Sequence, residues 1–365
     1  MTRFAFIVHP LTPKHAAKKY PIAQYVPDPI LEFYLARKSP VLMSKTSIIR
    51  SETGAETEGW YIACPLTPKQ MMSLPLELVY KRIHQCTEMA ADLGAELIGL
   101  GAFTSVVGDG GITIAKNARI AVTTGNSYTV ATAIEGTLRA AALLDVDLKS
   151  STLAVVGATG SIGKTCALML GREFGKTVLV GRDLARTQAI ADGIPGSVAS
   201  IDMEDIKQAD AVVTVTSSDA PVILPQHLKP GCIVCDVARP RDVSVRVAKE
   251  RPDVLVIEGG VVALPGSPEL GIDFGFPPKT AYACMSETIM LALEGRPESY
   301  TLGKDVSVAQ VEEMLGLAKK HGFKLAGFRS FEKAVDEENI NRARDARRSA
   351  GSPNIRVPSS GFAQS

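Results

Sequence analysis

The sequence has almost no net charge and no long apolar run. Its 40 Lys and Arg residues balance 39 Asp and Glu residues, which leaves a formal charge of +1. Nucleic acid and anionic membranes are therefore not expected partners. No stretch is long and apolar enough to span a bilayer, and residues 1–9 lack the apolar region and cleavage site of a secretory signal. These absences predict a cytoplasmic protein with no transmembrane segment; a peripheral contact with lipid stays open.

Cysteine is also sparse, and its spacing completes no metal site. The six cysteines are scattered through apolar contexts in a chain without an export signal, which predicts reduced thiols. Cys232 and Cys235 match half of a zinc motif. They fall in an apolar run that indicates a buried strand, where residues three apart point to opposite faces. Because no second such pair or His pair follows, we predict no metal.

The most informative stretch is residues 152–182. An apolar run enters the turn Gly157-Ala-Thr-Gly-Ser-Ile-Gly163, which opens a segment of helical period, and a second apolar run follows Gly175. This pattern is typical of a βαβ unit of about thirty residues. Glycines at such a turn let backbone N–H groups approach a pyrophosphate at the helix N-terminus. The predicted cofactor-binding residues are Gly157, Thr159, Gly160, Ser161, Ile162, Gly163 and Arg182.

Arg182 directs this site toward a phosphorylated cofactor. It follows the second run, about twenty residues beyond the last glycine, where the adenosine ribose binds. Asp or Glu at this place suits the 2′-hydroxyl of NAD, whereas a planar guanidinium suits a 2′-phosphate. We therefore predict NADPH as the cofactor. The alternative is that Arg182 is a solvated turn residue. The glycine spacing is looser than the strict dinucleotide motif, so the turn alone is a weak signal.

A P-loop is a second interpretation of the same stretch. Residues 158–165 are one residue short of that motif, and Asp236 could serve as a magnesium ligand. This interpretation leaves Gly157 and Arg182 without a role, so the dinucleotide site is preferred.

Around this unit the chain divides into four expected parts. They are an N-terminal α/β substrate domain (1–149), a Rossmann domain that binds NADP (150–260), a C-terminal loop and helices that carry the nucleophile (261–327), and a charged extension with a disordered tail (328–365). Alternating strands and helices after residue 151 predict an α/β fold with a doubly wound parallel Rossmann sheet. Residues 216–219, 237–240 and 258–260 follow its expected strands and are candidate rim loops; plain turn chemistry is the alternative.

Cys284 is the candidate nucleophile. Pro277 and Pro278 predict the start of a helix over 279–294, with Cys284 near its N-terminus. The positive end of the helix, together with Lys279, is expected to lower the pKa of the thiol. A thiolate is the species that attacks a thioester. The alternative is a small buried core cysteine.

Six segments between residues 97 and 323 carry a family resemblance. They are Leu100-Gly-Ala-Phe-Thr-Ser-Val, Thr123-Thr-Gly-Asn-Ser-Tyr-Thr129, residues 155–163, Gly259-Gly-Val-Val262, Ala283-Cys-Met-Ser-Glu-Thr-Ile-Met-Leu-Ala-Leu-Glu-Gly295 and His321-Gly-Phe323. They resemble the bacterial long-chain acyl-[acyl-carrier-protein] reductases that form fatty aldehydes, best known from cyanobacteria. The segments that contain Gly125 and Cys284 are the specific ones.

The resemblance implies a two-step reaction. Cys284 takes the acyl group from acyl carrier protein or acyl-CoA, and NADPH reduces the acyl-enzyme to an aldehyde. Thr124, Asn126 and Ser127 precede the cofactor strand at an expected helix start. They are candidate catalytic donors to the developing oxyanion, and helix capping is their alternative.

Three parts of the chain depart from this family: the first 95 residues, the segment between Val262 and Tyr282, and everything past residue 327. Acyl chain length, carrier identity, oligomeric state and the fate of the aldehyde stay open. Two other classes also stay open. One is an NADP-dependent oxidoreductase like the shikimate or amino-acid dehydrogenases, without a covalent step. The other is a nonenzymatic NADPH-binding protein in which Cys284 belongs to the core.

Overall fold

The larger sheet has the topology that the glycine turn predicts. The structure is a computed structural model that describes residues 1–18, 21–218 and 220–351. Within these residues, six parallel strands lie in the order β10-β9-β8-β11-β12-β13. This is the 3-2-1-4-5-6 order of the Rossmann fold, and it opens a crevice where the order reverses, between β8 and β11. The strands are Thr152–Val156 (β8), Lys176–Val180 (β9), Ser197–Ser200 (β10), Ala211–Thr214 (β11), Ile233–Asp236 (β12) and Leu255–Glu258 (β13).

The α/β fold class and the doubly wound sheet are thus confirmed. Apolar side chains fill both faces of the sheet, as continuous apolar runs require. The strand β10 was missed, because its Ser-Val-Ala-Ser sequence is short and only partly buried at the sheet edge. The flanking helices are Ser161–Leu170 (α6), Leu184–Ala191 (α7) and Val245–Glu250 (α8).

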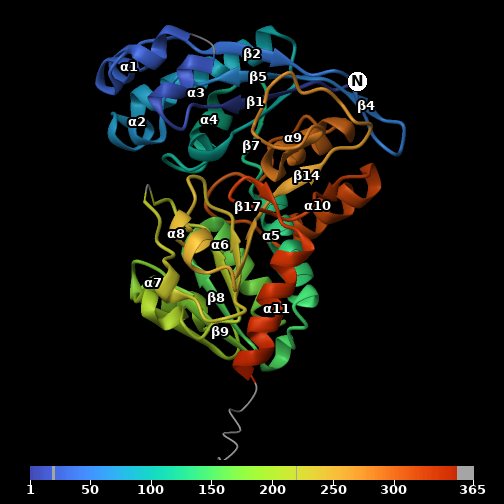
Figure 1. Ribbon diagram of the computed structural model, residues 1–365. Helices are drawn as coiled ribbons and strands as arrows, with labels where there is room; N and C mark the ends of the chain where they lie inside the picture. Colours follow the sequence, from blue (N-terminus) through green and yellow to red (C-terminus); the bar gives the residue numbers. More distant parts are fainter. Residues whose placement is uncertain (19–20, 219, 352–365) are drawn as a thin grey trace, which may run out of the picture.

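The N-terminal part forms a second sheet, drawn above the first in Figure 1. Its order is β2-β5-β1-β6-β7, with β2 antiparallel to β5 and the other pairs parallel. Along β1, Phe4 and Phe6 point into the core shared with the Rossmann unit, while Ala5 and Ile7 pack on the opposite face. The strands are Phe4–Val8 (β1), Val41–Lys45 (β2), Gly59–Ala63 (β5), Leu97–Gly99 (β6) and Ala121–Thr123 (β7).

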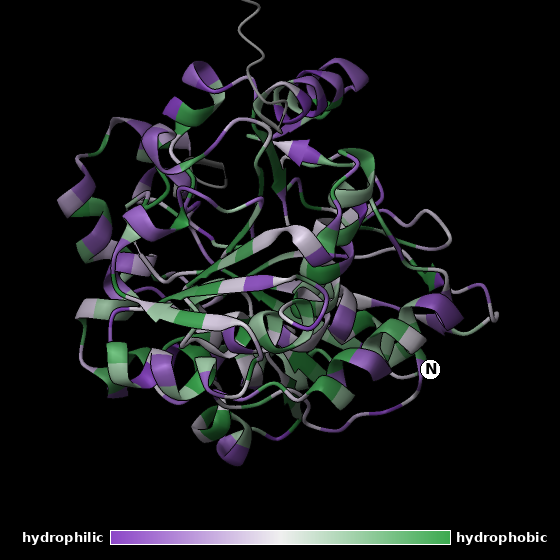
Figure 2. Ribbon diagram, turned by 90° about the horizontal axis from the view of Figure 1, so that it is seen from below, coloured by the Kyte–Doolittle hydropathy of each residue, from purple (hydrophilic) through white to green (hydrophobic). Residues whose placement is uncertain are grey.

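Helices cover the outer face of this sheet and border the cavity described below. In Figure 2 the outer helices carry both hydrophilic and hydrophobic residues, as expected of helices with one face toward solvent. None of the helices in the described part of the chain is long and apolar enough to cross a membrane. The N-terminal helices are Asp28–Leu35 (α1), Pro68–Ser73 (α2), Leu76–Asp92 (α3) and Ile112–Asn117 (α4), with 3₁₀ turns at Pro13–Lys18, Pro21–Tyr25 and Ala102–Ser105.

Two helices join the sheets. Helix α5, Asn126–Leu143, begins directly after β7 and runs down onto the Rossmann sheet, where it contacts α6 and β12 (Figure 1). Helix α9, Ala283–Leu293, packs against α5 and against β1 and β6 of the upper sheet. A Cβ at Gly99 would lie 2.2 Å from Thr288 Oγ1, so a glycine in β6 allows this close approach. One continuous apolar core results.

The predicted helix over 279–294 begins later than expected. Residues Thr280–Tyr282 form a strand, β15, which pairs with Val261–Ala263 (β14), and β14 also pairs with Lys324–Leu325 (β16). The two prolines lie in the loop before β15 and do not start the helix. The second C-terminal helix is Val308–His321 (α10), and Gly322 follows it in the left-handed conformation with φ of 85°.

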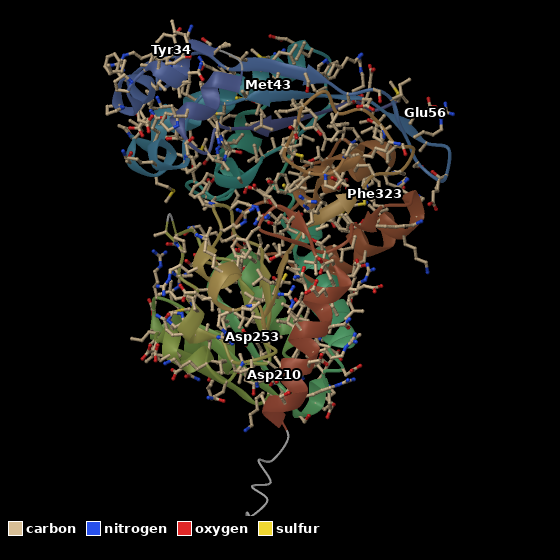
Figure 3. All side chains as sticks on the ribbon, in the orientation of Figure 1. Tyr34, Met43, Glu56, Asp210, Asp253 and Phe323 are labelled. Carbon is tan, nitrogen blue, oxygen red and sulfur yellow. The ribbon has the colours of Figure 1, made fainter. Side chains whose placement is uncertain are left out.

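The charged extension folds back over the Rossmann unit. After a hairpin of Arg329–Ser330 (β17) and Lys333–Ala334 (β18), helix α11, Glu337–Gly351, runs beside the lower sheet (Figure 1). Arg347 donates to Asp210 at 2.6 Å, near the lower end of α11 in Figure 3. Arg344 donates to the carbonyl oxygen of Leu143 at the end of α5. The predicted disordered tail, 352–365, lies outside the described residues.

Candidate active site

A cavity of about 1120 Å³ lies between the two sheets, and its lining is mostly apolar. All three expected rim loops contribute to it, through residues 215–217, 237–239 and 259–260. Asp219 of the first loop lies outside the described residues. The upper sheet contributes residues of β1, β2 and β5, and α1 contributes one side of the cavity. Residues from both units therefore face one space, at the carboxyl ends of the Rossmann strands.

Cys284 lines this cavity where the N-termini of two helices meet. It is the second residue of α9 and is half-buried. Gly125, the N-cap residue of α5, has φ of 75°, and a Cβ built on it would lie 2.3 Å from both Cα and Cβ of Cys284. Only glycine tolerates this conformation and this contact without strain. The segment of residues 123–129 is thus in direct contact with the candidate nucleophile, through Gly125.

The environment of the Cys284 thiol does not favour the thiolate. Burial raises its pKa to about 12. The backbone N–H groups of Met285 and Cys284 act against this rise, as expected at a helix start, and so does Arg239, whereas the charge of Glu287 adds to it. The prediction of a lowered pKa is therefore wrong, because desolvation outweighs the helix terminus. Lys279 is exposed and lies before β15, not one turn earlier in the same helix.

The three predicted donors before the cofactor strand differ in where their side chains lie. Asn126 and Thr124 line the cavity. The hydroxyl of Thr124 donates to the carbonyl oxygen of Thr301, whereas the amide of Asn126 lies 3.5 Å from Ser161 Oγ at the start of α6. Ser127 is completely buried, and its hydroxyl donates to Glu287. Of the three, Asn126 has the side chain that borders both the cavity and the glycine turn.

The sequence analysis missed Glu287, one turn after Cys284. Its side chain is completely buried, although α9 is otherwise almost entirely apolar. A lone carboxylate in an apolar helix is the signal that could have singled it out, because an unpaired charge is costly to bury. Its carboxylate accepts hydrogen bonds from Thr123 Oγ1 (2.5 Å), Ser127 Oγ (2.5 Å), the Tyr128 N–H (3.0 Å) and Thr301 Oγ1 (3.0 Å).

Arg239, from the expected rim loop 237–240, and Tyr282, which the sequence did not single out, also line the cavity. The guanidinium of Arg239 lies over the Tyr282 ring, 5.9 Å from its centroid, and pairs with Glu258 at 3.5 Å. Tyr282 in turn packs against Phe276, with ring centroids 4.6 Å apart. Because these residues come from three distant segments, only the folded chain brings them together.

The glycine turn has the shape that a dinucleotide requires. A Cβ at Gly163 would lie 2.3 Å from the Gly157 carbonyl oxygen, and one at Gly157 would lie 2.6 Å from that of Val215. A Cβ at Gly160 would meet nothing closer than 3.4 Å, and no side chain caps α6 there. The turn is thus packed against the sheet behind and open in front of the helix N-terminus, so its residues fit a pyrophosphate. Ile162, in the same turn, lines the cavity.

Arg182 lies beside this turn. It is exposed and follows β9 and Gly181. A Cβ at Gly181 would lie 3.1 Å from the Thr159 side chain, which measures how closely the end of β9 approaches the turn. No ion pair involves the guanidinium of Arg182 within residues 1–18, 21–218 and 220–351. Its position is compatible with a 2′-phosphate at the end of the second strand.

The P-loop alternative does not fit this geometry. Lys164, which would contact phosphates, pairs with Asp305 at 2.7 Å. The hydroxyl of Thr165 donates to the carbonyl oxygen of Val306. Asp236 is buried, and its carboxylate accepts hydrogen bonds from the backbone N–H groups of Ala238 and Val243. These groups organise neighbouring loops and do not converge on a magnesium site.

Cys232 and Cys235 lie on opposite faces of the Rossmann sheet. Cys235 belongs to the core shared with α5, and Cys232 belongs to the core on the other face. Burial raises the pKa of each thiol to about 12. The predicted geometry of this pair is therefore correct.

Comparisons with known proteins point to oxidoreductases. Residues 139–258 match the model of the shikimate / quinate 5-dehydrogenase family. The long-chain acyl-[acyl-carrier-protein] reductase of Synechococcus elongatus is 25% identical over 312 residues, which cover 81% of this chain and 90% of that protein. These matches support an oxidoreductase that uses a nicotinamide cofactor.

A further relative is named as an aminotransferase. The aminotransferase PigE of Serratia sp. is 30% identical over 352 residues, which cover 93% of this chain and 41% of that protein. The chain thus spans less than half the length of PigE. Among solved structures, the quinate dehydrogenase of Corynebacterium glutamicum in complex with NAD is 14% identical, covers 70% of this chain and 87% of its own, and has a TM-score of 0.35. The glutamyl-tRNA reductase of Methanopyrus kandleri is 19% identical, covers 77% of this chain and 58% of its own, and has a TM-score of 0.30.

Proposed function

We propose that this protein is a cytoplasmic NADPH-dependent reductase that converts a long-chain acyl thioester to a fatty aldehyde through an acyl group on Cys284. The observation that carries the proposal is the shared cavity. Cys284, at a helix start, and Ile162 of the glycine turn line one mostly apolar cavity. The resemblance to acyl-[acyl-carrier-protein] reductases supports it.

The cofactor would lie across the crevice of the Rossmann sheet. The backbone at Gly157, Gly160 and Ser161 would hold the pyrophosphate at the start of α6, and Arg182 would bind the 2′-phosphate. Thr159 and Ile162 would border the dinucleotide, and Gly163 permits the close packing of α6 behind it. When bound, NADPH supplies the hydride that reduces the acyl carbon.

The acyl group reaches the enzyme by attack of the Cys284 sulfur on the thioester carbonyl. A new C–S bond forms to Cys284, the bond to the carrier sulfur breaks, and the carrier leaves as a thiol with the proton that Cys284 lost. The oxyanion of this step needs donors in a dry site. Asn126 Nδ2 and the backbone N–H groups at the start of α9 are the proposed donors, because Asn126 and Cys284 line the same cavity. Thr124 and Ser127 would stabilise the position of these donors through hydrogen bonds inside the protein. The Thr124 hydroxyl donates to the Thr301 carbonyl oxygen, and the Ser127 hydroxyl donates to Glu287.

Reduction then releases the product. Hydride adds to the acyl carbon, the C–S bond to Cys284 breaks, and uptake of one proton restores the thiol and frees the aldehyde. Water must be kept out, because hydrolysis of the acyl-enzyme would compete. The mostly apolar lining formed by β1, α1 and the loop around Phe274 suits this requirement and the acyl chain. Acyl carrier protein or acyl-CoA is the proposed donor.

A carbonyl-reducing dehydrogenase without a covalent step is the second candidate, favoured by the family match over residues 139–258. It would leave Cys284 unmodified. An aminotransferase activity is not proposed, because the match to PigE covers 41% of that protein.

Intact-mass measurement separates the two candidates. Protein incubated with a long-chain acyl thioester and no NADPH should gain the mass of one acyl group, and added NADPH should discharge it as aldehyde. Cys284→Ser should bind NADPH normally, since the glycine turn is untouched, but should lose nearly all turnover, because a serine hydroxyl is almost never ionised at neutral pH. Wild-type aldehyde formation by Cys284→Ser would refute the covalent mechanism and favour the simple dehydrogenase.

A further inference from the structure

Glu287 is an unusual buried acid, because its four hydrogen-bond donors include no cation. Three are hydroxyls, and the fourth is the backbone N–H of Tyr128, at the third position of α5. The N-cap residue of α5 is Gly125, which has no side chain to cap the helix. The carboxylate of Glu287 therefore takes the place of a capping side chain. The positive end of an eighteen-residue helix is also a favourable site for a buried anion.

The donors come from three separate segments that converge on α9. Thr123 ends β7, Ser127 and Tyr128 belong to the first turn of α5, and Thr301 lies in the loop after α9. The carbonyl oxygen of Thr301 also accepts a hydrogen bond from the Thr124 hydroxyl. Through this one carboxylate the second turn of α9 is tied to the end of β7 and to the start of α5.

Cys284 and Asn126 are the groups whose relative position this tie controls. Cys284 precedes Glu287 by three residues, about one helical turn, and it packs against Gly125, which precedes Asn126. Within the described residues, the Asn126 side chain is hydrogen-bonded to Ser161 of α6, and no hydrogen bond of the Cys284 side chain joins α9 to α5. Glu287 is not part of the cavity lining, so it has no route to the substrate.

We propose that Glu287 is a positioning residue, which caps α5 from α9 and so holds the Cys284 sulfur at the attack geometry toward a carbonyl group bound beside Asn126. This inference rests on the proposed thioester reduction. An attack geometry displaced by about 1 Å lowers the rate of the chemical step about a hundredfold. Substrate binding depends on the apolar lining, to which Glu287 does not belong.

Three variants test this role. Glu287→Ala removes all four hydrogen bonds. Glu287→Gln keeps the size and can restore them, because its carbonyl oxygen accepts from Ser127 and the Tyr128 N–H while its amide donates to the threonine hydroxyls. The matched control is Glu294→Gln, which changes an acid at the C-terminal end of the same helix that pairs with Lys320 and His321.

We expect Glu287→Ala to lower kcat about a hundredfold with KM nearly unchanged, Glu287→Gln to recover kcat to within about fivefold of the wild type, and Glu294→Gln to match the wild type. Alkylation of Cys284 by iodoacetamide needs no defined approach to a bound substrate. Its rate in Glu287→Ala should therefore not fall below the wild-type rate, while acylation by a long-chain acyl thioester does. If Glu287→Ala does not fold, Thr123→Val removes one donor from a strand and should lower kcat about tenfold with KM unchanged.

Several results would overturn the inference. A folded Glu287→Ala variant with wild-type kcat would make the carboxylate a purely structural group. Equal losses in Glu287→Gln and Glu287→Ala would mean that the charge matters and the position does not. If acylation and alkylation fell together, Cys284 would have lost reactivity or access, not alignment. If the wild type itself takes up no acyl group, the proposed function fails and this role fails with it.

Discussion

At the scale of single residues, Cys284 is the centre of the proposed site, and opposing influences act on the pKa of its thiol. Burial raises its pKa, while two backbone N–H groups at the start of α9 and the guanidinium of Arg239 lower it. Burial dominates, so the thiol stays protonated at neutral pH. The thiol must then lose its proton as the sulfur attacks the substrate carbonyl. Hydrogen-bond donors around that carbonyl would favour this step, because they stabilise the oxyanion that forms.

The raised pKa makes a direct prediction for alkylation. Only the thiolate reacts with iodoacetamide, and its fraction grows tenfold per pH unit below the pKa. With a pKa of about 12, the rate of Cys284 alkylation should rise steadily from pH 7 to pH 10 without a plateau. Rates followed by peptide mass spectrometry measure this. A plateau near neutral pH would contradict the effect of burial.

Arg182 makes a second prediction at this scale. Charge-assisted hydrogen bonds to a phosphate contribute about 1.5–3 kcal/mol, or roughly tenfold to a hundredfold in affinity. Arg182→Ala should weaken NADPH binding by that factor and leave NADH binding nearly unchanged. Fluorescence titration measures both affinities. Lys176→Ala, an exposed charge at the opposite end of β9, is the control and should change neither. Equal wild-type affinities for the two cofactors would refute the assignment.

At the scale of elements, the site depends on how α5 and α9 meet. Both helices begin at the cavity, and each leaves backbone N–H groups at its start without partners in its own helix. Gly125 sets their separation, since any side chain there would overlap the backbone of Cys284. Two helix starts at one point form a site suited to a negative charge, such as the oxyanion of an acyl transfer.

Substitution of Gly125 tests this arrangement. Gly125→Ala combines a strained left-handed conformation, costing about 1–3 kcal/mol, with displacement of Cys284. Turnover should fall at least about a hundredfold. Gly136→Ala, in the middle of α5, is the control, because its Cβ would meet Ile257 at an ordinary 3.5 Å. It should keep activity and gain up to about 1 kcal/mol of stability from helix propensity. Thermal unfolding and steady-state kinetics distinguish the two; an active Gly125→Ala would disprove the tight contact.

At the scale of the whole molecule, the proposed function depends on two sheets that share one cavity. The Rossmann sheet supplies the glycine turn and the rim loops, and the upper sheet supplies an apolar surface bounded by α1. In Figure 1, α1 and α9 lie at opposite sides of the upper unit, so the cavity extends well away from Cys284. Tyr34, labelled in Figure 3, is a residue of α1 that lines this cavity.

This extent predicts selection by acyl chain length. Leu31 is a buried residue of α1 that lines the cavity. Leu31→Trp should shorten the space and lower kcat/KM for long-chain thioesters at least about tenfold more than for medium-chain ones, since overpacking costs about 1–3 kcal/mol. Phe33→Trp, on the exposed face of α1, is the control and should leave the preference unchanged. The measurement is kcat/KM for thioesters of several acyl chain lengths. An unaltered preference in Leu31→Trp would mean that the acyl chain binds elsewhere.

Local sequence determined the parts of the molecule whose conformation depends on near neighbours. Strand β1, helix α10 with its glycine stop, and the β8–α6–β9 unit were all predictable, because apolar periodicity and glycine placement act within a few residues. The opposite orientations of Cys232 and Cys235 followed from strand geometry alone.

Tertiary structure decided everything that depends on partners far along the chain. Thr280–Tyr282 became a strand because it pairs with Val261–Ala263, and this moved the start of α9 to Ala283. The pKa of Cys284 depends on burial beneath several segments, which a helix-terminus argument cannot include. Glu287 finds its donors more than 150 residues earlier in the chain, at Thr123 and Ser127, and those contacts exist only after both sheets have packed on α5.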